Sequence, residues 1–396
     1  MANTLLTSTQ VTRKALMILH QKLNFIGSIN RGYDDSFSKD GAKIGDTLKI
    51  RVPNQYPVRI GATMGTSPAT DTTENTVSLQ VATQKGVDVN FSSSELTLNL
   101  DDFSDRVLEP AMSALAANIE ADAMNMYKDV YQQVSNVTFK IDFNKVLQGR
   151  KKLVDSLAPL IDRTCNLNTQ DNLDLVDALK GLFQDSSAIA KQYREGYMGR
   201  TAGFDFMENT LWPSQARGDA ASYVCNTSTG ITSGTAVITV SGGSGTFKKG
   251  DVFTIAGVNA VHPESKVDTG QLQQFVATTD STTSISVSPN PISAAGATQN
   301  IVINSPGASK TVTVAGNAST NYGISMAYQK GAFAFATADL VLPRGVDFAA
   351  REVLDGISMR IVRQYDITND KFPCRIDVLY GYKAVRPQLA CRLANN

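Results

Sequence analysis

Residues 104–134 read SDRVLEPAMSALAANIEADAMNMYKDVYQQV, and this stretch is the clearest signal of the fold. Its apolar residues recur every three or four positions, close to the 3.6-residue period of an α-helix. They are Leu108, Met112, Leu115, Ile119, Ala123, Met126, Val130 and Val134. Pro110 is harmless in a first turn, where its missing N–H has no intrahelical partner. We therefore expect one long helix over 104–134, about 45 Å in length at 1.5 Å per residue.

Two alternating runs before this helix predict an extended β-hairpin over residues 41–82. Residues 45–58 alternate, and so do residues 77–81, with a Gly/Thr/Ser-rich tip between the two runs. The hairpin has few apolar residues to bury, so we expect it to pack on a neighbouring molecule. Residues 1–40 are mostly polar and end in a Gly- and Asp-rich segment, which predicts an N-terminal arm rather than a core element.

The composition changes abruptly after the middle of the chain. Arginine is absent between Arg217 and Arg344, and Ser and Thr become frequent. Six short β-branched runs separated by Gly, Pro and Asn predict a six-stranded β-barrel in residues 218–325. The runs are Thr235–Val240, Asp251–Ala256, Leu272–Thr278, Ser284–Ser288, Asn300–Asn304 and Thr311–Val314. Apolar positions available to its core include Val237, Ile238, Phe253, Ile255, Phe275, Val276, Ile285 and Val302.

The chain on both sides of this segment predicts a mixed α+β host domain. Helical patterns cover residues 143–157 and 173–183, and alternating apolar residues return over 331–393. Because host-like sequence resumes after the barrel, the barrel is expected to be an insertion, which requires its two ends to leave the host close together.

Composition argues against several classes of function. The chain has 37 Lys+Arg and 37 Asp+Glu, a formal net charge of zero. A nucleic-acid-binding protein usually carries a basic excess, because its affinity comes from neutralising phosphates. No run of apolar residues is long enough to cross a bilayer, and the N-terminus has no signal-peptide pattern. We expect a soluble protein made in the cytoplasm that binds neither a membrane nor a specific nucleic-acid sequence.

Residues able to carry catalysis are few. The two histidines, His20 and His262, lie in different predicted domains, and each is expected to be a solvated surface residue. The four cysteines form no C-x-x-C pair and have no zinc-type spacing, and we expect them to be reduced. No P-loop or calcium-loop pattern is present. We therefore predict a protein that is not an enzyme, with no catalytic, cofactor-binding or metal-binding residues and no cofactor.

Four local motifs resemble those of one family and occur in its order. They are Leu115-Ala116-Ala117-Asn118-Ile119-Glu120 with Asn125-Met126; Ala202-Gly203-Phe204-Asp205 with Pro213; Lys248-Lys249-Gly250-Asp251 with Ala256-Gly257-Val258; and Cys374-Arg375-Ile376 with Tyr380-Gly381 and Arg386-Pro387. Through them the chain resembles the coat proteins of short-tailed Salmonella-type phages, which have the Hong Kong-97 capsid fold with an insertion domain. The resemblance departs at residues 226–235, because the family's long charged barrel loop is short and uncharged here.

The resemblance implies a major capsid protein of a tailed bacteriophage, located in the virion. It implies an arm (1–40), a hairpin loop (41–82), a peripheral domain (83–150) containing the helix of 104–134, an axial domain with closing strands (151–217 and 326–396), and the inserted barrel (218–325). It also implies hexamers and pentamers of one chain that enclose double-stranded DNA. The implied partners are a scaffolding protein, a portal protein at one vertex and, as a further candidate, a decoration protein. A tail or adhesin-type structural protein with a β-barrel module is the alternative.

Overall fold

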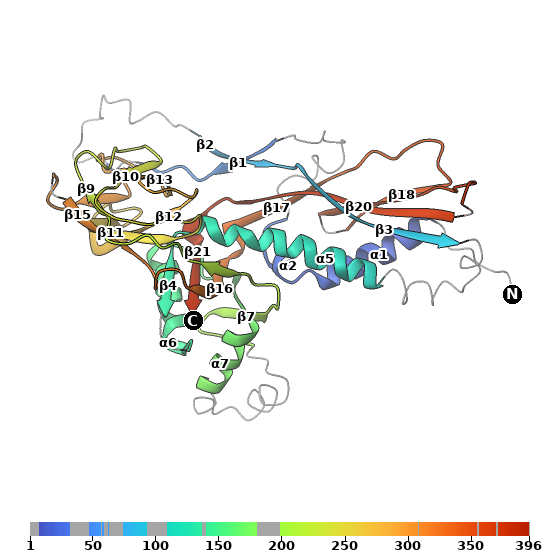
Figure 1. Cartoon of the computed structure of the whole chain (residues 1–396), viewed down its shortest axis with the longest axis horizontal. Coiled ribbons are helices and arrows are strands. Elements are labelled where there is room, and N and C mark those ends of the chain that lie inside the picture. Colours follow the sequence, from blue (N-terminus) through green and yellow to red (C-terminus); the bar gives the residue numbers. More distant parts are fainter. Residues whose placement is uncertain are drawn as a thin grey trace. The chain divides into compact units, whose positions relative to one another are not determined.

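The computed structural model describes residues 8–31, 47–56, 58, 62, 74–92, 109–136, 140–179, 199–307, 309–354, 356–369 and 371–395 (Figure 1). The chain forms two compact units, and each is built from segments distant in sequence. The first comprises Met1–Ile50, Thr76–Met124 and Phe333–Val385, and the second comprises Arg51–Asn75, Asn125–Ala332 and Arg386–Asn396.

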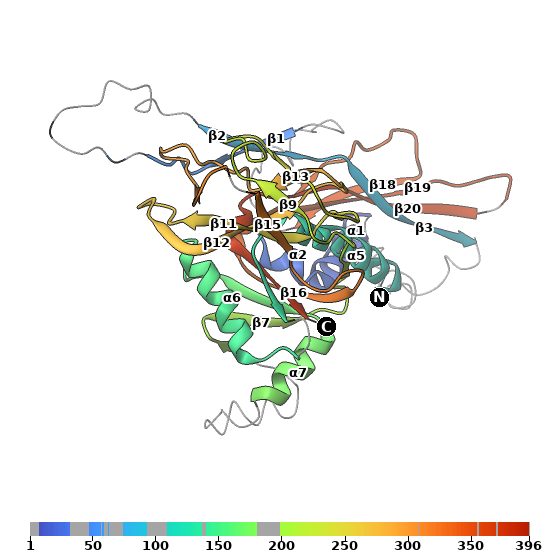
Figure 2. The same cartoon turned by 60° about the vertical axis from the view of Figure 1, so that its left-hand side comes forward.

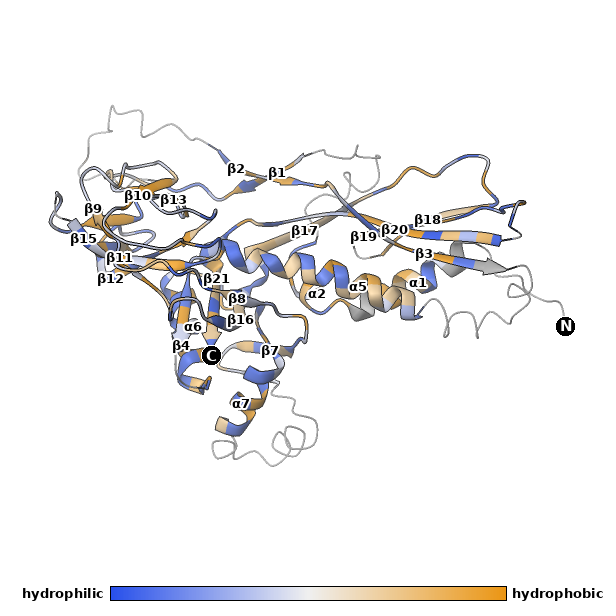
Figure 3. Ribbon diagram, in the orientation of Figure 1, coloured by the Kyte–Doolittle hydropathy of each residue, from blue (hydrophilic) through white to orange (hydrophobic). Residues whose placement is uncertain are grey.

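The first unit is an antiparallel sheet packed against helices. Its strands are β17 (Phe333–Ala338), β18 (Phe348–Leu354), β19 (Ile357–Arg363) and β20 (Lys371–Ala384), in the order β17-β20-β19-β18, and β3 (Thr83–Ser92) also pairs with β20. The helices are α1 (Ser8–Lys22), the short α2 (Phe25–Ser28) and α5 (Glu109–Met124). α1 contacts α5, β18 and β19. In Figure 3 apolar and polar residues interleave along α1 and α5, as expected for helices that bury one face.

The prediction of an N-terminal arm outside the core is wrong for the part of it that is described, residues 8–31. Ala15, Leu16 and Leu19 are fully buried on α1, and Phe25 and Ile26 are fully buried on α2. The amphipathic stretch is short, but its apolar face meets α5 and the sheet, so burial of that face outweighs the polar average of the segment.

The long helix predicted over 104–134 is shorter in the structure. α5 ends at Met124, a 3₁₀ helix, η4, covers Asn125–Asp129, and the strand β4 covers Gln133–Asn136. Residues 104–108 lie outside the described part. The buried positions of the ladder continue past the helix, since Met126, Val130 and Val134 are all buried. In residues 131–135 only Gln132 and Val134 are buried, which is the alternation of a strand. Val134 also lies four residues after Val130, so the same residue fits the spacing of a helix.

The second unit contains a mixed sheet that carries two helices. Its order is β4-β21-β16-β5-β7-β6, and β8 also pairs with β16. The strands not yet bounded are β5 (Arg163–Leu167), β6 (Arg200–Thr201), β7 (Phe204–Glu208), β8 (Ser214–Ala216), β16 (Asn321–Gln329) and β21 (Ala390–Asn395). α6 (Phe143–Asp155) contacts β4, β16 and β21, and α7 (Thr169–Leu179) follows β5. Figure 2 shows α6 and α7 with the strands β7 and β16 of this sheet. α6 ends two residues before its predicted end at 157, and α7 starts four residues before its predicted start at 173.

The predicted assignment of residues 326–396 to one axial domain is wrong. β16 and β21 belong to the mixed sheet of the second unit, whereas β17–β20 form the sheet of the first unit with β3. Alternation shows that each segment is a strand facing a core, but it does not show which strand lies beside it. The predicted group 83–150 is divided as well, because the first unit ends at Met124 and the second begins at Asn125.

The inserted segment is a nearly closed barrel of seven described strands, not six. The order is β10-β13-β12-β11-β15-β9, with β14 also paired to β11. The strands are β9 (Val224–Asn226), β10 (Val237–Thr239), β11 (Val252–Val261), β12 (Asp268–Ala277), β13 (Ser284–Ser288), β14 (Ile301–Ile303) and β15 (Ser309–Val314). Hydrogen bonds in both directions between Val224 and Ser241 connect β9 to the end of β10. The missed strand is β9, whose three residues include a single β-branched one, Val224.

The barrel encloses its own apolar core. Rings of Tyr223, Phe247, Phe253 and Phe275 follow one another at centroid distances of 5.1, 5.6 and 5.9 Å. Of the predicted core positions, Ile238, Phe253, Ile255, Phe275 and Ile285 are fully buried in this core, whereas Val276 is fully buried outside it. Val237 is instead 41% exposed and Val302 is half-buried. Val237 and Ile238 are adjacent in a strand, so their side chains must point to opposite faces.

The described part of the predicted hairpin consists of β1 (Thr47–Val52) paired with β2 (Asn75–Gln80). Ile50 and Leu79 are buried, whereas Thr47, Lys49 and Arg51 on the other face of β1 are exposed. Most of the tip lies outside the described residues.

Candidate functional site

The two ends of the barrel leave the mixed sheet side by side. β8 pairs with β16 at Ala216 and Asn321, and the ladder continues from Arg217 N–H to Thr320 C=O at 3.0 Å and from Ser319 N–H to Gly218 C=O at 3.3 Å. The insertion therefore begins after Gly218 and ends before Ser319. The predicted boundary at 325 is wrong, because residues 321–325 already belong to β16 of the host sheet.

Asp251, from the motif Lys248-Lys249-Gly250-Asp251, anchors this junction. Its buried carboxylate accepts hydrogen bonds from the backbone N–H groups of Gly218 (3.0 Å) and Lys248 (2.9 Å), and from Nε2 of Gln215 (3.4 Å). Burial raises the pKa of the Asp251 carboxyl, and the two backbone N–H donors oppose that rise. Gly218 cannot be replaced without rearrangement, because a Cβ there would lie 2.1 Å from the Thr246 carbonyl oxygen.

Arg392 approaches the same junction from the last strand of the chain. Its fully buried guanidinium donates from Nη1 to the Gly250 carbonyl oxygen at 2.8 Å and lies 5.9 Å from the centroid of the Tyr127 ring. Tyr127 in turn donates its hydroxyl hydrogen to Oε1 of Gln215 at 2.9 Å. Burial lowers the pKa of Arg392 to about 10, so this residue stays charged at neutral pH. Burial raises the pKa of Tyr127 to about 12, which keeps its hydroxyl protonated.

This cluster, which we call the junction network, consists of Tyr127, Gln215, Asp251 and Arg392 with Gly218 and Gly250. Its polar groups come from η4, β8, β21 and the loop before β11, so it links the barrel to three parts of the host. Its carboxylate accepts from two backbone N–H groups and from Gln215, its guanidinium donates to a backbone carbonyl oxygen, and no nucleophile stands beside a base in it. Such an arrangement holds two domains together by buried, hydrogen-bonded polar groups.

The other motifs of the resemblance also occupy positions that the backbone requires. Ala202 and Gly203 form the two-residue loop between β6 and β7, and both have positive φ (54° and 80°), as a type I′ hairpin turn demands. A Cβ on Gly381 would lie 2.2 Å from the Gln80 carbonyl oxygen. Glu120 is buried and accepts a hydrogen bond from the Phe25 backbone N–H, which ties α5 to α2.

Ion pairs reinforce the first unit near the C-terminal motif. The fully buried carboxylate of Asp377 accepts from Arg360 at 2.7 Å and from Arg375 at 2.8 Å. Asp122 on α5 accepts from Lys85 of β3 at 2.7 Å and from the Tyr380 hydroxyl at 2.6 Å. These pairs hold β3, β19, β20 and α5 together.

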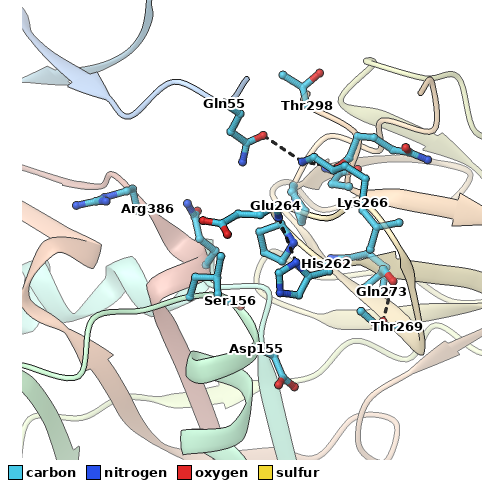
Figure 4. A pocket seen from close by; sticks show the side chains of 18 of the residues that line it. Gln55, Asp155, Ser156, His262, Glu264, Lys266, Thr269, Gln273, Thr298 and Arg386 are labelled. Atoms are coloured by element: carbon cyan, nitrogen blue, oxygen red, sulfur yellow. Dashed lines mark hydrogen bonds between the residues drawn. The ribbon is translucent and has the colours of Figure 1, made fainter. Parts of the chain in front are cut away.

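A cavity of about 1120 Å³ lies in the second unit (Figure 4). It is lined by the β11–β12 hairpin, the C-terminal end of α6, residues 52–56 and Val58. His262 lies in it, half-buried, where Nδ1 accepts from the backbone N–H groups of Glu264 (3.3 Å) and Ser265 (3.1 Å). The His262 side chain therefore stabilises its own turn. A histidine that was only a solvated surface residue, as predicted, would not make these two hydrogen bonds. Nothing is described of the His20 side chain, although His20 lies on α1.

Groups of three His, Cys, Asp or Glu side chains suited to holding a metal ion are absent from the described residues. None of the described helices is long and apolar enough to cross a bilayer. The four cysteines are free, and Cys165, Cys225 and Cys391 are buried.

Sequence patterns did not identify Tyr127, Gln215 or Arg392 as junction residues. Arg392 lies in the run Ala390-Cys391-Arg392-Leu393-Ala394, all of it buried. A single arginine among apolar residues is the available signal for a buried charge, but nothing in the sequence shows which group it meets.

Comparison with known proteins identifies the family. The model of the P22 coat protein (gene protein 5) matches residues 39–392. A search of curated protein sequences finds no relative. Similar solved structures include Mycobacterium phage Che8 (12% identity, 94% of this chain and 91% of that chain, TM-score 0.47) and the mature capsid of bacteriophage PhiM1 (10%, 91% and 84%, 0.45). A third is the capsid of Cyanophage P-SCSP1u (10% identity, 90% of this chain and 84% of that chain, TM-score 0.41).

The family match covers nearly all of the chain, whose architecture is α+β with an inserted barrel. This chain therefore belongs to the P22 coat protein family, and it is a major capsid protein that self-assembles into the shell of a tailed bacteriophage.

Proposed function

We propose that copies of this chain form the hexamers and pentamers of an icosahedral shell around double-stranded DNA, and that the β1–β2 hairpin joins neighbouring copies. The observation that carries the proposal is the one-sided burial of this hairpin. Ile50 and Leu79 are covered within the subunit, whereas Lys49 and Arg51 stay exposed on the opposite face. A hairpin with one free face has a surface for a second copy of the chain.

Further partners and properties belong to the same proposal. A scaffolding protein would guide assembly in the host cytoplasm, a portal protein would occupy one vertex, and a decoration protein is a further candidate. The formal net charge of zero supports a wall that encloses DNA without binding it specifically. The polar groups of the junction network bond to backbone atoms and to one another, which supports a role without catalysis.

Overexpression of the full chain, alone and with a scaffolding protein, tests the function by electron microscopy. We expect closed shells or polyheads. A tail or adhesin-type protein would instead give fibres or soluble oligomers, and that result would overturn the proposal.

The role of the hairpin is testable by acylation of lysines in free subunits and in shells. We expect Lys49 to lose most of its reactivity on assembly, because the adjoining copy would cover it. Lys151, exposed on α6, is the matched reporter within the same molecule. Equal labelling of Lys49 in both states would show that the hairpin face remains free.

A further inference from the structure

The barrel has a second attachment to the host, outside the junction network. The side-chain amide of Gln274 on β12 makes three hydrogen bonds to host residues. Its Oε1 accepts from the backbone N–H of Gln133 at 3.0 Å and from Nζ of Lys152 at 2.8 Å. Its Nε2 donates to the backbone C=O of Gln133 at 3.0 Å. The lysine can only donate, so it fixes which end of the amide carries the oxygen.

Gln133 begins β4, which is an edge strand of the mixed sheet as far as the described residues show. β4 runs parallel to β21 with Gln133 opposite Arg392, and the Arg392 N–H donates to the Gln132 carbonyl oxygen at 2.8 Å. In a parallel ladder the N–H and C=O of Gln133 must then point away from β21, toward the open edge of the sheet. The amide of Gln274 therefore supplies the two hydrogen bonds that another strand would supply at this position.

The position of the Gln274 contact determines its effect on the rotation of the barrel. Gly218, Ser319, Asp251 and the Gly250–Arg392 bond all lie where the two chain ends cross into the barrel. Attachments gathered at one place allow a domain to pivot about it. Gln274 holds the barrel to β4 and α6, on the strand next to Arg392, and together with the bond from Lys266 Nζ to Gln55 Oε1 at 3.5 Å it restrains such a pivot.

We propose that Gln274 is a positioning residue, which fixes the orientation of the inserted barrel on the mixed sheet and closes the edge of β4 to other chains. Orientation is a property of the single subunit, so this claim stands apart from the proposed arrangement of copies in the shell. Its consequence for assembly, shells of uniform size, rests on the proposed function.

Three variants separate the contributions of the contact. Gln274→Met keeps the length of the side chain and removes all three hydrogen bonds. Gln274→Glu keeps the acceptor for Gln133 N–H and Lys152, and it removes the donor to the Gln133 carbonyl oxygen. Gln271→Met is the matched control, because Gln271 is an exposed residue of the same strand that makes none of these contacts.

Orientation is measured in full-length subunits by electron–electron distance distributions. Spin labels at Ala178→Cys and Thr282→Cys report on host and barrel, since both positions are exposed. Half-buried Cys374 is changed to Ser, and the other three cysteines are buried. We expect Gln274→Met to broaden the distance distribution and to speed amide exchange at Gln133 by about fivefold, the effect of losing one hydrogen bond. For Gln274→Glu, we expect the width of the distance distribution and the exchange rate at Gln133 to lie between those of Gln274→Met and of the wild type.

An unchanged distance distribution in folded Gln274→Met would overturn the positioning role, even if amide exchange at Gln133 rose. If Gln274→Met does not fold, Gln274→Glu decides, and wild-type behaviour in that variant contradicts the proposal. Failure of the wild-type chain to form shells would bear on the proposed function and would leave the orientation measurement intact.

Discussion

Asp251 and Arg392 show at the scale of single residues why the junction could be only partly inferred from the sequence. The motif containing Asp251 was visible, because it matches a family pattern. The role of Asp251 could not be inferred, since two of the three groups that donate to its carboxylate are backbone N–H groups. Neither the composition nor the spacing of residues indicates a backbone hydrogen-bond partner. The role of a buried polar residue of this kind can therefore be recognised only in the folded structure.

Asp171 provides a test of buried polar chemistry through pH. It accepts hydrogen bonds from Ser325 of β16 and from Asn395 of β21, which joins the start of α7 to two strands. Burial outweighs these bonds and raises the pKa of the carboxyl above its ordinary 3.8. The folded state therefore holds the proton more tightly than the unfolded chain. The contribution of Asp171 to the free energy of unfolding is complete below about pH 4 and falls as pH rises through the folded-state pKa.

Asp171→Asn cannot ionise, so we expect the variant to lose less stability than wild type as the pH rises from about 4 to about 7. Urea unfolding of the subunit at several pH values measures this difference. Asp155→Asn, an exposed carboxylate on α6, serves as the control and should follow wild type. Parallel stability curves for wild type and Asp171→Asn would mean that the carboxyl titrates normally in the folded state.

At the scale of elements, the local patterns found most strands and the cores they face. The run Ser284–Ser288 coincides with β13, and the buried ladder from Met112 to Val134 holds throughout. The form of the ladder was misjudged after Met124, because helical and strand spacing agree over so few residues. Pairing between distant strands was also out of reach. β3 lies beside β20, almost three hundred residues later in the chain.

The barrel is the element most readily separated from the rest. It has a continuous apolar core of its own and leaves the host through the paired residues 218 and 319. We expect a fragment of residues 218–319 to fold alone, because about a hundred residues can bury a sufficient core without disulfides or metal. Dispersed two-dimensional NMR spectra and protected amides in β11 and β12 would confirm this. Collapsed spectra would mean that the segment needs the host in order to fold.

At the scale of the whole molecule, the chain builds both units from interrupted segments. The first unit uses segments up to the end of α5 and a segment after β16, and the second receives its last strand only from residues 390–395. Neither unit is complete until nearly all of the chain is available. Resemblance to a family predicted the class of fold and the function, whereas the division into units required the observed strand pairing.

The adjacency of Gly218 and Ser319 has a consequence for the kinetics of folding. β16 must find β5 and β8 across the whole insertion, and closing a loop of about 100 residues costs about 3 kcal/mol more in chain entropy than closing one of about 4. A barrel that folds first brings its own ends together and removes most of that cost. Early formation of the insertion would thus speed the docking of β16, although none of the inserted strands belongs to the host sheet.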